Sequence, residues 1–305
     1  MLFALRPYHR GDRADVDALL DDDSDPLLVA QLHPLHGPDR DGDRWRRTVL
    51  AVTEQGEVVG AGTAARNRVH PDTLSTIIEV SAGHRRRGVG SRLLAGLRSV
   101  APDGATFRGK VHESDRPGYG FAMAVGAQVV VRSPGLIFSP PYHKLRAWIA
   151  RQPTPDGARV DSLARCSDEE LLENWLTLYV RVHEDWSPAA ARPTLRGVFT
   201  ELVGNIRADS SAGSWSRRDG QLLAVAFALA ESPSTVTVVA ETLRAGQPRG
   251  LAQLAAVLAR CFEQLIAVGV SEITLDGHNV DEHLAPLTAT MPATHRNPLL
   301  LVALT

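Results

Sequence analysis

The sequence is poor in cysteine, poor in aromatic residues and nearly balanced in charge. Of its 305 residues, the only cysteines are Cys166 and Cys261, which lack the spacing of a zinc site or a disulfide framework. The formal net charge is −2 and neither half is basic, which argues against a dedicated nucleic-acid binder. We therefore expect no metal and no nucleic-acid partner.

Long hydrophobic runs are also lacking. No stretch of about 18 consecutive apolar residues occurs, and the N-terminal segment soon becomes charged, unlike a secretion signal. The hydrophobic content of 44% and the charged content of 22% are typical of globular proteins. A chain of this length suits two domains, so we expect a two-domain cytoplasmic protein without a membrane partner.

The most informative segment is residues 79–94. The apolar run at residues 76–80 predicts a buried strand, and leucines at helical spacing predict a helix over residues 91–100. The intervening loop has the pattern R-x-x-G-x-G. Strand, glycine-containing loop and helix N-terminus together present unpaired amides to an anion. The predicted diphosphate site comprises Val80, Arg85, Arg86, Arg87, Gly88, Val89, Gly90 and Ser91. The alternative is a solvated basic surface cluster.

The same pattern recurs near the C-terminus. Gln247, Gly250 and Ala252 form Q-x-x-G-x-A between a β-rich run and a second predicted helix. Glu241 precedes Gln247 by six residues, as Glu79 precedes Arg85. Two such matches indicate a duplicated domain. We place the domains at residues 1–150 and 151–305, because clusters of proline, aspartate and glycine at residues 139–157 are typical of a linker.

The first loop resembles motif A of the GCN5-related N-acetyltransferases (GNATs), whose Q/R-x-x-G-x-G/A loop holds the pyrophosphate of acetyl-coenzyme A. The resemblance covers nearly the whole chain as two tandem units, similar in plan to the mycothiol synthases. It implies an α/β fold in which each unit is a mixed, mostly antiparallel sheet flanked by helices. Strands four and five would splay apart and admit the pantetheine. It further implies acetyl-CoA as co-substrate and the primary amine of a small molecule as acceptor, attacking the thioester directly.

The catalytic residues depart from this family pattern. Ala122 stands where the family has the tyrosine that protonates the leaving thiolate, and Tyr119 could replace it only if its segment is helical. Glu79 is a candidate general base beside the expected cleft, or alternatively an outward strand residue in a salt bridge. His112 and Glu113, at the end of the expected fifth strand, could line the substrate side or simply be polar surface residues.

The first copy is expected to bind acyl-CoA better, because Pro248 removes an amide donor from the second loop. A second cofactor site would use Gln247, Arg249, Gly250, Ala252 and Asn279. Two alternatives stay open: a CoA-binding sensor or structural subunit without turnover, and an enzyme using another acyl-CoA. The acidic run at residues 21–25 could attract a cationic amine or be a solvated loop. The chain is expected to be a monomer or a homodimer.

Overall fold

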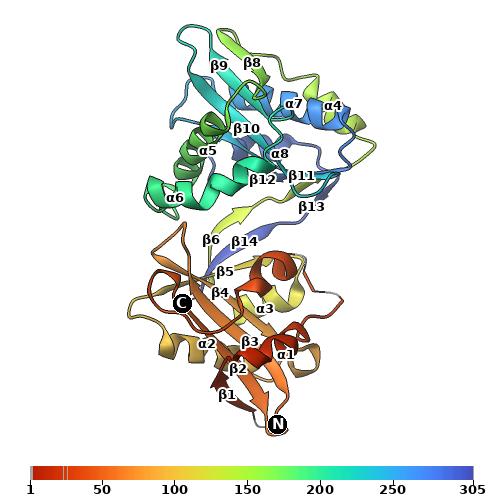
Figure 1. Cartoon of the computed structure of the whole chain (residues 1–305). Helices are drawn as coiled ribbons and strands as arrows, with labels where there is room; N and C mark the ends of the chain where they lie inside the picture. The colour runs from red at the N-terminus through yellow and green to blue at the C-terminus, as the bar shows by residue number, and fades with distance from the viewer. Residues whose placement is uncertain (1–2, 23, 26, 305) are drawn as a thin grey trace. The chain divides into compact units, whose positions relative to one another are not determined.

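The computed structural model describes residues 3–22, 24, 25 and 27–304, and the chain forms two compact units (Figure 1). Unit 1 comprises residues 1–130 and 300–305, and unit 2 comprises residues 131–299. Each unit is built on its own seven-stranded sheet.

Unit 1 has the strand order β1-β2-β3-β4-β5-β14-β6. Its strands are β1 (Phe3–Pro7), β2 (Arg46–Thr53), β3 (Val58–Arg66), β4 (Thr73–Val80), β5 (Thr106–His112), β6 (Gln128–Ser133), which runs on into unit 2, and β14 (Leu299–Leu304). Its helices are α1 (Arg13–Asp17), α2 (Val89–Val100) and α3 (Arg116–Ala124). Short helical turns are η1 (Arg10–Asp12), η2 (Leu28–Leu32), η3 (His33–Leu35), η4 (Gly42–Arg44) and η5 (Ala82–His84).

Helices cover both faces of the first sheet. On one face, Leu93 and Leu97 of α2 are fully buried, and a Cβ atom added at Gly62 of β3 would lie 3.2 Å from Leu97. On the other face, Val16 of α1 packs with Leu50 of β2 in a separate apolar cluster. The predicted amphipathic helix is therefore confirmed, and it begins at residue 89, two residues earlier than expected.

The parallel pair β4–β5 is paired over only part of its length. Its register joins Thr73 to Thr106, Leu74 to Phe107 and Ser75 to Arg108. Beyond these pairs, residues 76–80 of β4 remain paired with β3 on their other side. Residues 109–112 of β5 continue without a partner on β4 in the described part of the chain. The two strands therefore part at residues 76 and 109, as predicted for strands four and five.

Unit 2 has the strand order β13-β7-β12-β11-β10-β9-β8. Its strands are β7 (Leu136–Phe138), β8 (Ala158–Ser162), β9 (Ala212–Ser216), β10 (Leu222–Ala230), β11 (Thr235–Thr242), β12 (Glu272–Asp276) and β13 (His295–Arg296). Its helices are α4 (His143–Ile149), α5 (Asp168–His183), α6 (Arg192–Phe199), α7 (Gly250–Ala267) and α8 (Leu284–Thr290), with the turn η6 (Thr200–Asn205).

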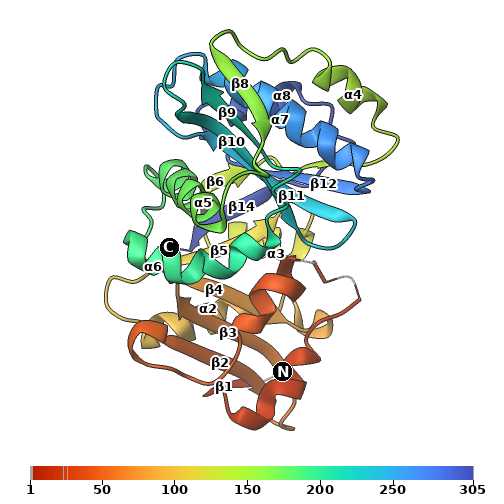
Figure 2. The ribbon, with the colours of Figure 1, turned by 45° about the horizontal axis from the view of Figure 1, so that its top comes forward.

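The core helix of unit 2 is α7, which packs along one face of the second sheet (Figure 2). Leu254, Leu258 and Phe262 of this helix are fully buried. By length and mean hydropathy (1.3) it is the one described helix that could cross a membrane, but 67% of its most apolar stretch is buried within the protein. Buried core helices share these properties. The packing of α7 therefore explains its apolar composition.

The compact units differ from the predicted division at residue 150. Leu136, Phe138, Leu145 and Trp148 are buried in the core of unit 2, so β7 and α4 belong there and not to the first unit. The last strand, β14, returns to the first sheet and lies between β5 and β6. The proline-rich stretches within residues 139–157 are connections, as predicted. The helix between them, α4, packs into the core of unit 2. Proline and glycine patterns mark turns and do not reveal which core a short strand joins.

The start of α1 depends on the buried carboxylate of Asp12. It accepts two hydrogen bonds from the Arg6 guanidinium, at 2.7 and 2.8 Å, and one from the amide of His9 at 2.6 Å. Asp12 is the N-cap residue of α1, but its side chain makes no cap bond there. The hydrogen bonds from Arg6, and then that from His9, hold the pKa of Asp12 below its usual value.

Replacing Asp12 by Asn should therefore destabilise the fold by about 1–3 kcal/mol at neutral pH, because a charge-assisted pair is lost. Since the folded-state pKa is lowered, the contribution of Asp12 is present above the unfolded-state pKa and is lost as the pH falls through the folded value. The difference between wild type and Asp12→Asn should shrink as the pH falls below about 4. Urea unfolding at several pH values measures it, with the exposed Glu54→Gln as control. A constant difference across that range would contradict the account.

Candidate functional site

The loop between β4 and α2 forms an anion-binding nest. Gly88, with φ +80°, caps α2, and Arg86 also has a positive φ of 64°. Among the described residues, the backbone amides of residues 86–91 have no backbone acceptor. The first turn of α2 adds the positive end of its dipole, and the side chains of Arg86 and Arg87 are exposed beside it. Free amides, dipole and guanidinium groups together suit a diphosphate.

Arg85 has a different part from its two neighbours. Its Nε donates to the carbonyl of Val80 at 3.1 Å, and its guanidinium donates to Asp21 at 3.1 Å. The side chain thus fastens the loop to the end of β4 and to the acidic segment. Asp21 and Asp25 of the acidic run are hydrogen-bonded, whereas Asp23 lies outside the described residues.

The second glycine of the motif makes room for α3. A Cβ atom added at Gly90 would lie 2.9 Å from the ring of Phe121. Val89 beside it is buried, while Ser91 is exposed. The motif therefore combines two requirements: Gly88 supplies the left-handed backbone, and Gly90 lets α3 approach the loop.

A cavity of about 110 Å³ lies in the wedge between β4 and β5. The parted segments of both strands line it, through Thr76, Ile77 and Ile78 on one side and residues 109–112 on the other. The remaining wall comes from η2, α3 and β14. The cavity thus opens where the pairing of β4 and β5 stops, and it offers unpaired strand backbone to an extended ligand.

His112 is the histidine that lines this cavity. Its Nδ1 lies 2.7 Å from a carboxylate oxygen of Asp25, which also lines the cavity. Both side chains are largely buried, with exposed fractions of 17% and 12%. When Nδ1–H donates to Asp25, the lone pair stands on Nε2, which is the tautomer of a general base. His112 thus lines the cavity, and its assignment to the substrate side stays a prediction.

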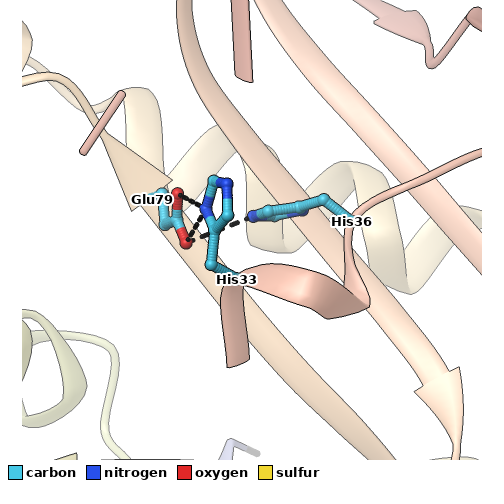
Figure 3. Close-up of side chains that lie close together, drawn as sticks. All are labelled: His33, His36 and Glu79. Atoms are coloured by element: carbon cyan, nitrogen blue, oxygen red, sulfur yellow. Dashed lines mark hydrogen bonds and ion pairs between the residues drawn. The ribbon is translucent and has the colours of Figure 1, made fainter. Parts of the chain in front are cut away.

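Glu79 lies beside the cavity but does not line it. Its side chain is 4% exposed, and both carboxylate oxygens lie 2.9 Å from Nδ1 of His33 (Figure 3). Nε2 of His36 lies 3.5 Å from the same carboxylate. On β4, Glu79 faces the side opposite to Ile78 and Val80, which pack with α2. Glu79 is therefore not an outward-facing strand residue, because it is buried. It is also not a free general base, because its carboxylate contacts two histidines.

Little in the sequence pointed to His33 and His36. They stand in a His-x-x-His spacing, with His33 starting η3 and His36 directly after it, in a segment without hydrophobic periodicity. A pair of histidines one helical turn apart is a known metal-ligand spacing, and it was the only available signal. Their relation to Glu79 depends on how residues 28–36 fold back over the sheet, which local sequence does not determine.

Tyr119 does not replace the missing tyrosine at the cavity. Its segment is helical, as that role required, since α3 spans Arg116–Ala124. However, Tyr119 is 37% exposed and is absent from the cavity wall, which α3 forms with Gly118, Phe121 and Ala122. Tyr119 and Glu79 are therefore not brought together in this structure.

The corresponding loop of unit 2 is filled by the protein's own side chains. The amide of Gly246 donates to the carboxylate of Glu282, at 3.0 and 3.2 Å. A Cβ atom added at Gly250 would lie 2.4 Å from the His283 ring, which covers the start of α7. Arg249 has a positive φ of 59° and donates to the carbonyl of Asp156. The His283 ring thus covers the helix start that a phosphate would approach, whereas Gly246 corresponds to His84, outside the amides of residues 86–91.

The other predicted residues of the second site are placed as follows. Gln247 is half-buried and Ala252 is exposed on the first turn of α7. Asn279 exchanges hydrogen bonds with the backbone of Arg132, at 2.8 and 2.9 Å, and so extends the edge of β6. All five residues of β12 pair with β11, over residues 235–239 of that strand.

Glu241, the counterpart of Glu79, is a structural residue. It is 1% exposed, and its oxygens accept from the backbone amides of Thr242, His283 and Leu284 at 2.6 to 3.0 Å. It therefore holds the start of α8 against β11. With these bonds its carboxylate is not a free base.

Residues 16–119 match the model of the Acetyltransferase (GNAT) family. No curated protein gives a significant match. Among solved structures, a tandem GNAT protein from the clavulanic acid biosynthesis pathway is 16% identical, with a TM-score of 0.60, covering 100% of this chain and 99% of that chain. A GCN5-related N-acetyltransferase from Sphaerobacter thermophilus is 17% identical, with a TM-score of 0.58, covering 99% and 96%. A GCN5-related glucosamine N-acetyltransferase region of a fungal multi-domain GH3 beta-N-acetylglucosaminidase is 14% identical, with a TM-score of 0.59, covering 99% of this chain and 38% of that chain.

These comparisons confirm the resemblance predicted from the first loop. The matched residues contain the nest, Glu79 and most of the cavity wall. The structural likeness extends over both units and shows a tandem GNAT fold. At these identities it shows the fold alone, so chemistry must be argued from the residues.

Replacing Glu241 by Gln should destabilise unit 2 by about 1–3 kcal/mol, because one amide acceptor and a buried charge-assisted network are lost. CoA binding by unit 1 should not change. Chemical denaturation and a CoA titration of the same preparation measure both effects, with the exposed Glu231→Gln as control. A stable Glu241→Gln variant with weakened CoA binding would contradict the structural role.

Proposed function

We propose that this tandem GNAT-fold chain is an acyl-CoA-dependent N-acyltransferase, and that unit 1 carries the reaction. The finer proposal is acetyl transfer from acetyl-CoA to the primary amine of a small molecule in the cytoplasm. The observation that carries it is the meeting, in one unit, of a free amide nest with a cavity between parted strands. A linear ligand with a diphosphate at one end fits that combination.

The diphosphate would bind the amides of residues 86–91, with Arg86 and Arg87 close enough to add charge-assisted contacts. The pantetheine arm would run between residues 76–78 and 109–111, where its amides can pair with unpaired strand backbone. The arm would take the place of the missing ladder hydrogen bonds, and this satisfies backbone groups that the parting leaves free.

The reaction needs a neutral amine and a place for one proton. The amine nitrogen attacks the thioester carbon, the carbon–sulfur bond breaks, and the proton lost by the amine balances the one gained by the CoA thiolate. His112 is positioned to exchange this proton at the cavity, with Asp25 fixing its tautomer. Glu79 remains the candidate base predicted from the sequence, and it would act only through a group that reaches into the cavity. The exposed Tyr119 is the weaker candidate for the acid.

A second candidate function is a CoA-binding sensor or structural subunit without turnover. Ala122 lies at the cavity wall in place of the family's tyrosine, and this observation favours it. The use of another acyl-CoA is a third possibility within the same chemistry. Turnover on an amine separates the sensor from the enzyme, and comparison of acyl donors separates the two enzymes.

One CoA should bind per chain, because the His283 ring lies against Gly250 in the second loop, whereas nothing lies within 4 Å of a Cβ atom added at the corresponding Gly88. Isothermal titration calorimetry with acetyl-CoA at low salt measures the stoichiometry. A value near two would show that the second loop opens, and the assignment of the site to unit 1 would fail.

Replacing Arg86 and Arg87 together by Ala should raise the Kd for CoA about 10- to 100-fold, since charge-assisted phosphate contacts are lost. The same calorimetric titration measures the change. The exposed Arg218→Ala in unit 2 is a matched control and should leave the Kd unchanged. Equal affinity in the double variant and wild type would move the diphosphate away from this loop.

His112→Asn should retain CoA binding and lower turnover about 10²- to 10⁴-fold. Asn can keep the hydrogen bond to Asp25 but has no counterpart of the imidazole Nε2. Thiol release from acetyl-CoA with a mixed panel of amines measures the rate. Wild-type protein that binds CoA but turns over no amine would instead support the sensor, and unaltered turnover in the variant would remove His112 from the mechanism.

A further inference from the structure

Three side chains with metal-binding atoms converge in a buried site of unit 1, beside the cavity but outside its wall. They are His33 from η3, His36 directly after η3 and Glu79 from β4, all buried (Figure 3). A buried carboxylate and two imidazoles in mutual contact are costly unless each polar atom has a partner. The partners of these atoms therefore show what the cluster is built to hold.

The atoms that face one another are Nδ1 of His33, Nε2 of His36 and the carboxylate of Glu79. The two ring nitrogens lie 2.9 and 3.5 Å from that carboxylate, and all three ligand atoms lie within 4.8 Å of each other. A tetrahedral zinc ion with bonds of about 2.0–2.2 Å separates its ligand atoms by about 3.3 Å. Small side-chain shifts would bring these three atoms around one ion.

Nε2 of His36 is the atom that lacks a hydrogen bond. It is buried and makes none in the described structure, although it points at the carboxylate of Glu79. The other nitrogen, Nδ1, lies 2.6 Å from Oγ1 of Thr63, which in turn lies 2.8 Å from Oγ1 of Thr48. When Nδ1–H donates to Thr63, a lone pair on Nε2 faces an anionic carboxylate. A cation between the two removes that repulsion and supplies the missing partner.

The outer nitrogen of His33 is also held. Its Nε2 lies 2.8 Å from Oδ1 of Asp17 at the end of α1. Histidines that bind metals usually donate their other ring N–H to a carboxylate or another oxygen, which fixes the ring and its tautomer. Both histidines have such an oxygen beside their other ring nitrogen, Asp17 for His33 and Thr63 for His36. In unit 2, by contrast, the counterpart of Glu79 is Glu241, whose oxygens accept hydrogen bonds from backbone amides.

We propose that His33, His36 and Glu79 bind one divalent transition-metal ion of the zinc class, with Asp17 and Thr63 orienting the two rings. Two imidazoles and one carboxylate are a borderline-soft ligand set, which suits zinc over magnesium or calcium. This differs from the sequence expectation of no metal, which considered only the cysteine pattern. The ion would fasten the segment of His33 and His36 to β4, and the chain neighbours Leu32 and Ile78 line the cavity. While it is bound, Glu79 is a ligand and not a free base.

The test uses the full-length protein, stripped with a chelator and dialysed. Titration with Zn²⁺, followed by calorimetry and by elemental analysis after gel filtration, should show about one tightly held ion per chain. Bound zinc should also raise the melting temperature, since ligands of the native state stabilise it. Substitution with Co²⁺ should give an absorption spectrum of tetrahedral coordination.

His36→Asn and Glu79→Gln should each abolish tight binding. Asn can keep the contact with Thr63 while removing the ligand nitrogen, and circular dichroism with gel filtration checks that both variants fold. Asp17→Asn should weaken zinc binding about 10- to 100-fold, because it only orients His33. Asp15→Asn, an exposed carboxylate on the same helix, is the matched control and should bind as wild type does.

Less than about one tenth of an ion per wild-type chain after titration, or equal zinc affinity in folded His36→Asn, would overturn the proposal. The cluster would then be a hydrogen-bonded chain in which His33 bridges Glu79 and Asp17. CoA titrations of the same samples keep this outcome separate from the proposed function, because the diphosphate nest shares no residue with the cluster.

Discussion

The parting of β5 from β4 after three residue pairs is the constraint on which the site depends. A strand that leaves its neighbour exposes amides and carbonyls that must find partners. On its far side β5 stays paired with β14, and β4 stays paired with β3, so each strand is supported while the gap between them stays open. The nest before α2 lies at the end of β4, so the cavity and the anion site are joined by one strand.

The second unit has the same fold, but its own side chains lie at the loop that corresponds to the nest. All of β12 is paired, Glu282 accepts from the loop amide, and His283 covers the start of α7. Glu241 keeps the position of Glu79 but has become a cap for the backbone of α8. The duplicated loop pattern therefore reflects common architecture, and unit 1 adds a cavity between its parted strands.

The sequence predicted those features that depend on local chemistry. The R-x-x-G-x-G spacing located the nest, and helical periodicity located α2. It did not predict that β14 returns to the first sheet, or that β7 and α4 join unit 2, because strand exchange is set by long-range packing. The contacts of Glu79 with His33 and His36 were missed for the same reason. Spacing along the chain shows which residues can approach one another, and only the fold shows which of them do.

The most direct measurement is a crystal structure of the protein with CoA. The account predicts the diphosphate against the amides of residues 86–91 and the pantetheine between residues 76–78 and 109–111, with the loop of unit 2 empty of ligand. CoA bound at residues 247–252, or a diphosphate that does not touch the turn at Gly88, would contradict it.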